Sequence, residues 1–197
     1  MKKKYISTFC KIFTGLAFLL EIFSCSTTNL EQNSLSKVFV TNSKSINILE
    51  PNKIDSNVDS VYLLSANFGE VSFNILSYIQ ADVSGIFLDF LNDFGTSMGS
   101  LIYEEKKLSL NCTFLPKKLK GEYIVNDLQL VFYKSESLEQ NYKNSGLLFL
   151  EKNEDEKKER FIYSGKKLIE KAEILENEIV IENFLRSYKY TLVSNGL

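Results

Sequence analysis

Several residue types are absent or scarce in this chain of 197 residues. It contains no histidine, no tryptophan, three cysteines and two prolines. The absence of histidine excludes histidine-based catalytic triads, histidine-ligated zinc sites and acid–base catalysis by an imidazole. No glycine-rich phosphate-binding loop occurs either. Any catalysis would therefore depend on lysine, carboxylate, tyrosine or cysteine side chains.

Two short matches to a catalytic motif test that remaining possibility. "SLSK" at 34–37 and "SGKK" at 164–167 both have the Ser-x-x-Lys spacing of penicillin-binding proteins, in which a helical turn brings the lysine to the serine hydroxyl. The first match lies in a polar segment and the second in a predicted turn, so neither begins a helix. We therefore expect a protein that is not an enzyme and that needs no cofactor or metal.

The first 25 residues have the layout of an export signal. Three lysines follow Met1, and residues 12–20 form an apolar core that is shorter than the roughly 20 residues needed to span a bilayer. "IFSC" at 22–25 resembles the lipobox of bacterial lipoproteins, in which the cysteine is acylated before cleavage. The alternative is a buried or disulfide-bonded Cys25 in an uncleaved amphipathic helix. We expect Cys25 to be the acylated first residue of the mature protein.

Processing at this position would change the charge and the attachment of the protein. Removal of the signal peptide, residues 1–24, takes away four lysines and one glutamate, which moves the formal charge from −2 to −5. A mildly acidic protein is a poor partner for nucleic acid. The acyl chains of the anchor would hold it to a membrane. We therefore expect a lipid-anchored protein of the bacterial cell envelope, on the outer membrane rather than the inner membrane.

The rest of the chain divides into a polar segment and a domain. Residues 25–57 are rich in serine, threonine and asparagine, which is typical of a tether that holds a lipoprotein domain away from its membrane, although the short "KVFV" at 37–40 could add an edge strand. From residue 58 to 197 the composition is that of a single domain. Cys112, the only other cysteine left after processing, is expected to be a small buried residue rather than a reactive thiol.

Most of this domain reads as strands. In "KLSLNCTF", residues 107–114, apolar and polar residues alternate, which indicates a half-buried strand. Turn signals separate further segments of the same kind, and short connections favour antiparallel neighbours. The predicted strands fall at residues 70–82, 85–93, 97–105, 107–114, 146–153, 158–165, 177–185 and 188–195.

One segment has the period of a helix. Within residues 119–142, apolar side chains recur at the spacing i, i+4, i+7 and i+8. They are Ile124, Leu128, Val131 and Phe132. We predict one or two helices with a break near residues 135–137. The fold class is mainly β with some helix (α+β): a curved antiparallel sheet or incomplete barrel of about eight or more strands, wrapped around one or two helices.

Three stretches resemble a family of uncharacterised bacterial lipoproteins. "NDLQLVFY" at 126–133 is similar to that family's helix, "IENFLRSYKYTLV" at 181–193 to its final hairpin, and "FLNDFGTSMGSLIYEE" at 90–105 with its preceding residues to its strand–turn–strand. The resemblance runs from about residue 60 to 194. The family is similar in architecture to the lipoprotein carriers LolA and LolB, whose incomplete barrels shelter acyl chains.

This resemblance implies a function but no catalytic residues. It implies a membrane-anchored carrier that binds or transfers an acyl chain of a lipid or lipoprotein inside the half-barrel. The alternative is a structural or interaction lipoprotein with a closed core, and apolar strand faces look the same in both cases. Under the first hypothesis the ligand-lining candidates are Ile86, Leu88, Phe90, Leu108, Leu110, Phe114, Leu128 and Phe132.

Overall fold

The computed structural model describes residues 33–34 and 36–194. The predicted signal peptide at 1–24 and the predicted acylation site Cys25 lie outside the described residues. Within the described ranges, no helix has both the length and the apolar character needed to cross a membrane.

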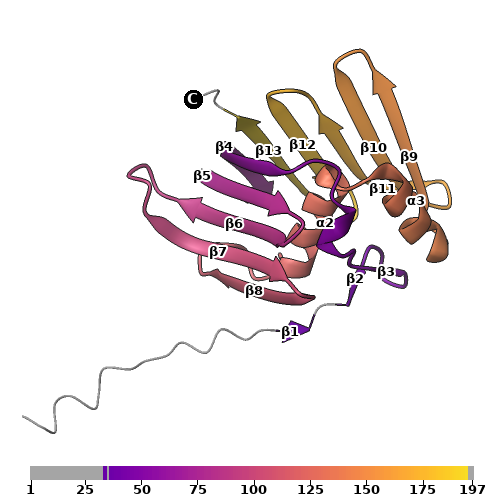
Figure 1. Cartoon of the computed structure of the whole chain (residues 1–197), viewed down its shortest axis with the longest axis horizontal. Helices are drawn as coiled ribbons and strands as arrows, with labels where there is room; N and C mark the ends of the chain where they lie inside the picture. The colour runs from indigo at the N-terminus through magenta and orange to yellow at the C-terminus, as the bar shows by residue number, and fades with distance from the viewer. Residues whose placement is uncertain (1–32, 35, 195–197) are drawn as a thin grey trace, which may run out of the picture. The chain divides into compact units, whose positions relative to one another are not determined.

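The domain is built on one antiparallel sheet of eleven strands (Figure 1). Its first half consists of β4 (Val58–Phe68), β5 (Val71–Asp82), β6 (Gly85–Leu91), β7 (Ser97–Glu104) and β8 (Lys107–Cys112), with β1 (Asn33–Ser34) added at the edge. Its second half consists of β9 (Leu148–Glu154), β10 (Lys157–Ser164), β11 (Lys167–Ile174), β12 (Glu178–Asn183) and β13 (Tyr188–Ser194). Strands that follow one another within each half pair with one another, and β4 pairs with β13 where the halves join.

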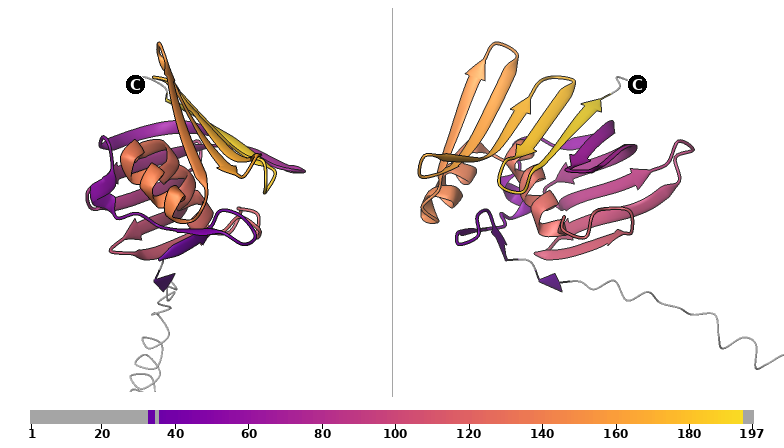
Figure 2. Two further views of the ribbon diagram at one scale, coloured as in Figure 1. Left: turned by 90° about the vertical axis from the view of Figure 1, so that its right-hand side faces the viewer. Right: turned by 180° about the vertical axis from the view of Figure 1, so that it is seen from behind.

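The sheet curves around two helices that lie on its concave side (Figure 2). These helices are α2 (Gly121–Phe132) and α3 (Ser135–Asn144). In the described part of the chain the two edges of the sheet, β1 and β9, do not pair with each other. The predicted fold class is therefore confirmed: a mainly β protein with a curved antiparallel sheet wrapped around two helices.

Helix α2 is covered on nearly all sides, as its sequence requires. Ten of its twelve residues are buried. Its first residue, Gly121, lies against β8, where an added Cβ atom would come within 3.0 Å of Leu108 Cδ2, so glycine permits this close approach. The helical period predicts both helices correctly. The break falls at Tyr133 and Lys134, just before the predicted position.

Residues 36–57, here called the N-terminal strap, fold onto the helices. The strap contains the hairpin of β2 (Lys37–Phe39) and β3 (Ser45–Asn47) and the short 3₁₀ helix Pro51–Lys53. It buries five apolar side chains, which are Val38, Val40, Ile46, Ile48 and Ile54. The folded part of the chain therefore begins before residue 58, because alternate apolar residues within this polar segment reach the common core.

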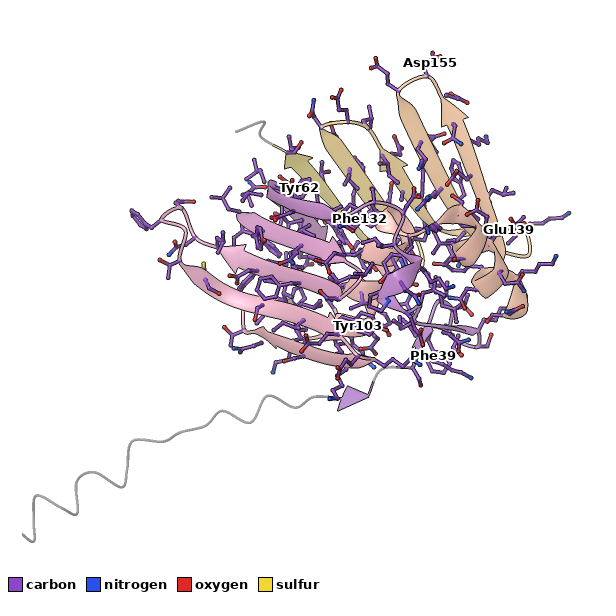
Figure 3. All side chains as sticks on the ribbon, in the orientation of Figure 1. Phe39, Tyr62, Tyr103, Phe132, Glu139 and Asp155 are labelled. Atoms are coloured by element: carbon purple, nitrogen blue, oxygen red, sulfur yellow. The ribbon has the colours of Figure 1, made fainter. Side chains whose placement is uncertain are left out.

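Side-chain amides on the helices hold the strap in place. Gln129 donates to the carbonyl oxygen of Leu49 at 2.8 Å and accepts from its amide nitrogen at 3.0 Å, as a neighbouring strand would. Asn141 donates to the carbonyl of Asn47 at 2.6 Å. Figure 3 shows the side chains crowded between sheet, helices and strap. The Tyr103 hydroxyl also donates to the Leu49 carbonyl, at 3.2 Å.

Candidate functional site

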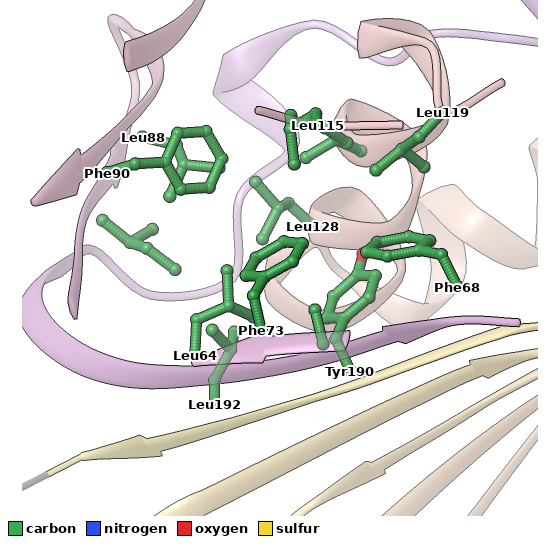
Figure 4. A pocket seen from close by; sticks show the side chains of 13 residues that line it. Leu64, Phe68, Phe73, Leu88, Phe90, Leu115, Leu119, Leu128, Tyr190 and Leu192 are labelled. Carbon is green, nitrogen blue, oxygen red and sulfur yellow. The ribbon is translucent and has the colours of Figure 1, made fainter. Parts of the chain in front are cut away.

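An apolar cavity lies between the concave face of the sheet and α2 (Figure 4). Its volume is about 30 Å³. Its lining comes from β4, β5, β6, β13, the segment before α2 and α2 itself, and consists of Leu64, Ala66, Phe68, Phe73, Ile79, Leu88, Phe90, Leu115, Leu119, Ile124, Leu128, Tyr190 and Leu192. Tyr190 has the only polar side chain in this set. The site can therefore receive apolar groups and little else.

The predicted lining residues divide between this cavity and the core around it. Leu88, Phe90 and Leu128 line the cavity. Of the remaining five candidates, none of which lines it, three are buried elsewhere in the core and two are half-buried against it. The buried residues are Ile86, Leu108 and Phe132, and the half-buried ones are Leu110 and Phe114.

The segment between β8 and α2, residues 113–120, covers one side of the cavity and is here called the lid loop. Leu115 and Leu119 from this loop line the cavity directly. Phe114 packs edge-to-face on two aromatic rings of the lining, with centroids 5.4 Å from Phe73 and 5.3 Å from Phe90. Apolar contacts of this kind have no strict direction, so the lid loop is held mainly by packing.

A buried polar cluster lies beside the cavity and joins α2 to the sheet. Asp127 on α2 is completely buried, and its Oδ2 accepts hydrogen bonds from the hydroxyls of Tyr188 at 2.8 Å and Tyr190 at 2.6 Å. The two tyrosine rings are stacked with centroids 5.9 Å apart. Tyr190 therefore contributes its ring to the apolar cavity while its hydroxyl fixes the helix.

A second buried carboxyl group, Glu170 on β11, completes the cluster. Its Oε2 accepts long hydrogen bonds from Asn126 at 3.5 Å and Asn183 at 3.4 Å. Asn126 in turn accepts a hydrogen bond from the Tyr142 hydroxyl of α3 at 3.3 Å. Burial strongly raises the pKa of Glu170, and the neighbouring Asp127 charge raises that pKa further.

The two carboxyl groups differ in how well their ionised forms are stabilised. Burial also raises the pKa of Asp127, but hydrogen bonds from Glu170, Tyr190 and Tyr188 stabilise its ionised form. Glu170 accepts only two long amide hydrogen bonds, so its ionised form is stabilised less than that of Asp127. Because both groups are at most 1% exposed, a substrate cannot reach them. We therefore assign the pair to holding α2 in position.

A buried arginine fixes the end of α2. Arg160 on β10 is fully buried and donates to the carbonyls of Leu130 at 2.7 Å and Val131 at 2.9 Å, which belong to the last turn of the helix. The same guanidinium donates to Glu151 at 2.8 Å and Ser135 at 3.1 Å. A cation at this position satisfies carbonyls that a helix end leaves free.

The members of this polar cluster were not among the site residues predicted from the sequence. Asp127 and Glu170 interrupt apolar stretches of a helix and a strand, and that interruption is the signal that could have identified them. Cys112 is a half-buried free thiol, and burial raises its pKa, so it is not an activated nucleophile. Within residues 33–34 and 36–194, no group of three or more His, Cys, Asp or Glu side chains is arranged to hold a metal ion.

The sequence comparison places the chain among known families. Residues 60–195 match the family described as "Protein of unknown function (DUF3261)". The chain belongs to the DUF3261 family. No curated protein matches its sequence.

The DUF3261 match begins in β4 and extends through β13, so it includes the cavity, the lid loop and the polar cluster. The N-terminal strap lies before the match. Two of the stretches on which the resemblance was based, 126–133 and 181–193, meet in space, because Asp127 of the first binds Tyr188 and Tyr190 of the second.

Proposed function

We propose that this protein is a lipid-anchored envelope protein whose domain binds an acyl chain of a lipid or lipoprotein between the sheet and α2. The observation that carries the proposal is the cavity, because twelve of its thirteen lining side chains are apolar and the thirteenth directs its hydroxyl to Asp127. Such a site favours a hydrocarbon over any polar ligand. Binding would be reversible burial without covalent chemistry.

The size of the cavity determines how a chain would enter. A volume of about 30 Å³ has room for about one or two water molecules, whereas ligand pockets usually measure roughly 300–1,000 Å³. Binding therefore requires the site to open. Helix α2 is fixed by directional hydrogen bonds, and the lid loop is held by packing, so the lid loop is the part we expect to move.

The architecture agrees with this proposal by analogy. A curved antiparallel sheet around helices is also the architecture of the carriers LolA and LolB. Fold analogy alone does not determine function, so the proposal depends on the cavity itself. Acylation of Cys25 and a place on the outer membrane are part of the proposal. They would present the domain to lipids and lipoproteins of the envelope.

The test is uptake of a neutral apolar dye by the full chain carrying Cys25→Ser, which cannot be acylated and so has no anchor of its own to fill the cavity. Nile red fluorescence should rise and saturate at about one dye per protein. Ala66→Leu, which fills the cavity from β4, should abolish most of this rise. Ala81→Leu is the matched control, because Ala81 is buried on β5 but does not line the cavity.

The folding of both variants is checked by circular dichroism before dye binding is compared. The acyl-binding proposal is wrong if Nile red does not bind, or if it binds equally well to a folded Ala66→Leu variant.

The alternative function is a non-enzymatic interaction lipoprotein with a closed core. The small volume of the cavity favours it, as does Phe94, which is 93% exposed in the turn between β6 and β7. An exposed aromatic side chain of this kind suits a contact with another protein. A chain that binds no dye, and associates with an envelope partner only when Phe94 is present, would establish this alternative.

A further inference from the structure

A second, larger cleft opens beside the apolar cavity. Its volume is about 380 Å³, and Phe68 and Leu119 line both spaces. The cleft is formed by the β4–β5 turn, the lid loop, the start of α2 and the β12–β13 turn. Its other lining residues include Pro116, Lys118, Tyr123, Arg186, Ser187 and Tyr188. A ligand in the cavity could therefore extend into this cleft.

The cleft is cationic, although the chain as a whole is slightly acidic. Lys118 and Arg186 are the only charged residues in its lining. Among the described residues, neither of these two side chains forms a salt bridge. Lys117 and Lys120 flank Lys118 in the lid loop, and Lys120 Nζ lies 3.7 Å from a carboxylate oxygen of Glu122. Two basic residues thus line the cleft, and two more lie close to one of them in the sequence.

Arg186 is held so that part of its guanidinium stays free. It lies 4.0 Å from the ring centroid of Tyr123, and it donates to the strap carbonyls of Val40, at 3.3 Å, and Phe39. These two bonds use two of the five N–H donors of a guanidinium, which leaves three. A fork of donors over an aromatic ring is a common site for carboxylate or phosphate oxygens.

Besides Glu122, which pairs with Lys120, and the buried Glu170, two carboxylates lie near this positive charge, and both are placed where they leave the cleft open. Glu70 follows Gly69 in the β4–β5 turn and is exposed to solvent. Asp127 lies beneath Tyr188, where its Oδ2 is already bound by two hydroxyls. An anion in the cleft would therefore face Lys118 and Arg186 first.

We infer that the cleft binds the anionic head group of an amphiphile whose hydrocarbon chain enters the adjacent apolar cavity. This inference rests on the proposed acyl-binding function and adds the chemical class of the ligand. Carboxylates and phosphate esters share the oxygen geometry that a lysine and an arginine recognise. The charge complementarity excludes a neutral head group as the preferred ligand.

The experiment compares three amphiphiles with the same chain, dodecanoate, dodecyl phosphate and dodecanol, as competitors of Nile red. The protein is again the full chain with Cys25→Ser, at about pH 8, where a carboxylic acid is ionised. We expect the two anions to displace the dye at about tenfold lower concentration than the alcohol does. This preference should shrink in about 1 M NaCl, because the Debye length falls to about 3 Å.

Charge-reversal variants identify the site. Lys118→Glu should remove most of the preference for the two anions over dodecanol. Lys166→Glu is the matched control, because Lys166 is an exposed lysine in the β10–β11 turn, outside the lining of the cleft, and it gives the same change in net charge. A stronger preference for dodecyl phosphate or for dodecanoate would distinguish a phosphate ester from a fatty acid.

The remaining outcomes overturn the inference in different ways. Equal affinity for all three amphiphiles, or an unchanged preference in Lys118→Glu, would refute the head-group site while the acyl-binding function stands. Failure of every amphiphile to displace the dye would refute both. Competition by inorganic phosphate as strong as that by dodecyl phosphate would show a site for free phosphate instead.

Discussion

The two sides of α2 hold the helix by different kinds of contact. Toward β4, β5 and β6 it presents Ile124 and Leu128 to a cavity with apolar walls. Toward β10, β11 and β13 it is fixed by hydrogen bonds of Asp127 and of the carbonyls that bind Arg160. Directional bonds to buried groups allow one position of the helix, whereas apolar packing allows neighbouring side chains to shift.

This contrast suggests that the polar and apolar sides of α2 have different roles in the domain. Hydrogen bonds to buried groups are costly to break, because each donor or acceptor left unpaired loses its interaction with water as well. The polar side should therefore determine whether the domain folds. The apolar side, together with the lid loop, should determine which ligands the domain binds.

The largest expected effect on stability comes from replacing Arg160 on the polar side of α2. Arg160→Met should lower the free energy of unfolding by about 3–5 kcal/mol, because it leaves Glu151 and two helix carbonyls without their buried cation. Urea unfolding followed by circular dichroism measures the change. Lys158→Met, at a more exposed position of the same strand, is the control. A loss below about 1 kcal/mol for Arg160→Met would contradict the assignment.

The next effect comes from the helix side of the polar cluster. Asp127→Ala should cost about 2–4 kcal/mol, since the buried hydroxyls of Tyr188 and Tyr190 both lose their acceptor. Asp127→Asn keeps one acceptor oxygen and should cost less. Asp93→Ala, at an exposed position in the β6–β7 turn, should leave the urea midpoint unchanged. If Asp127→Ala proves as stable as Asp93→Ala, the cluster does not hold the helix.

The sequence predicts the fold better than it predicts this cluster. Strand alternation and the helical period are local signals, and they locate β8 and α2 to within a few residues at their ends. Strand β11 was not among the predicted strands, because Glu170 occupies one of its inward positions and interrupts the apolar alternation. Glu170, which obscures the strand pattern in the sequence, is therefore also a member of the polar cluster.

The cavity and the cluster required long-range information. Leu88, Phe90 and Leu128 line the cavity, whereas Ile86 and Leu108 are buried elsewhere, yet all five are apolar residues in regular elements. No local pattern separates these two groups. Asp127 lies 61 and 63 residues from its two tyrosine donors, so its partners become evident only when α2 is placed against β13.

A smaller effect on stability is expected from the apolar side. Phe114→Ala removes edge-to-face contacts with Phe73 and Phe90, and because Phe114 is only half-buried the loss should be about 1–2 kcal/mol. Uptake of Nile red should become faster, since the lid loop is held less firmly. Stopped-flow fluorescence measures this rate, and Phe94→Ala controls for loss of an aromatic side chain. An unchanged uptake rate would show that the lid loop is not the entrance.

The remaining expected effect is a change of stability with pH. Burial raises the pKa of Glu170 and of Asp127, so the folded state binds protons more tightly than the unfolded state does. Their contribution to stability is complete below the ordinary carboxyl pKa and is lost as the pH rises through the raised values. The free energy of unfolding should therefore fall as the pH rises above about 5.5, beyond the ordinary carboxyl range.

Above about pH 5.5, neither histidine nor the carboxyl groups with a lowered pKa obscure the titration of the pair. The chain has no histidine. Carboxyl groups with a lowered pKa, such as Asp82 at about 2 and Glu173, are ionised in both states above about pH 5.5. Glu170→Gln should therefore flatten the dependence, whereas Glu156→Gln, in the exposed β9–β10 turn, should preserve it. A slope that survives Glu170→Gln would place the titrating group elsewhere. A slope that disappears would show that deprotonation loosens the polar side of α2, while the apolar cavity has no group that responds to pH in this range.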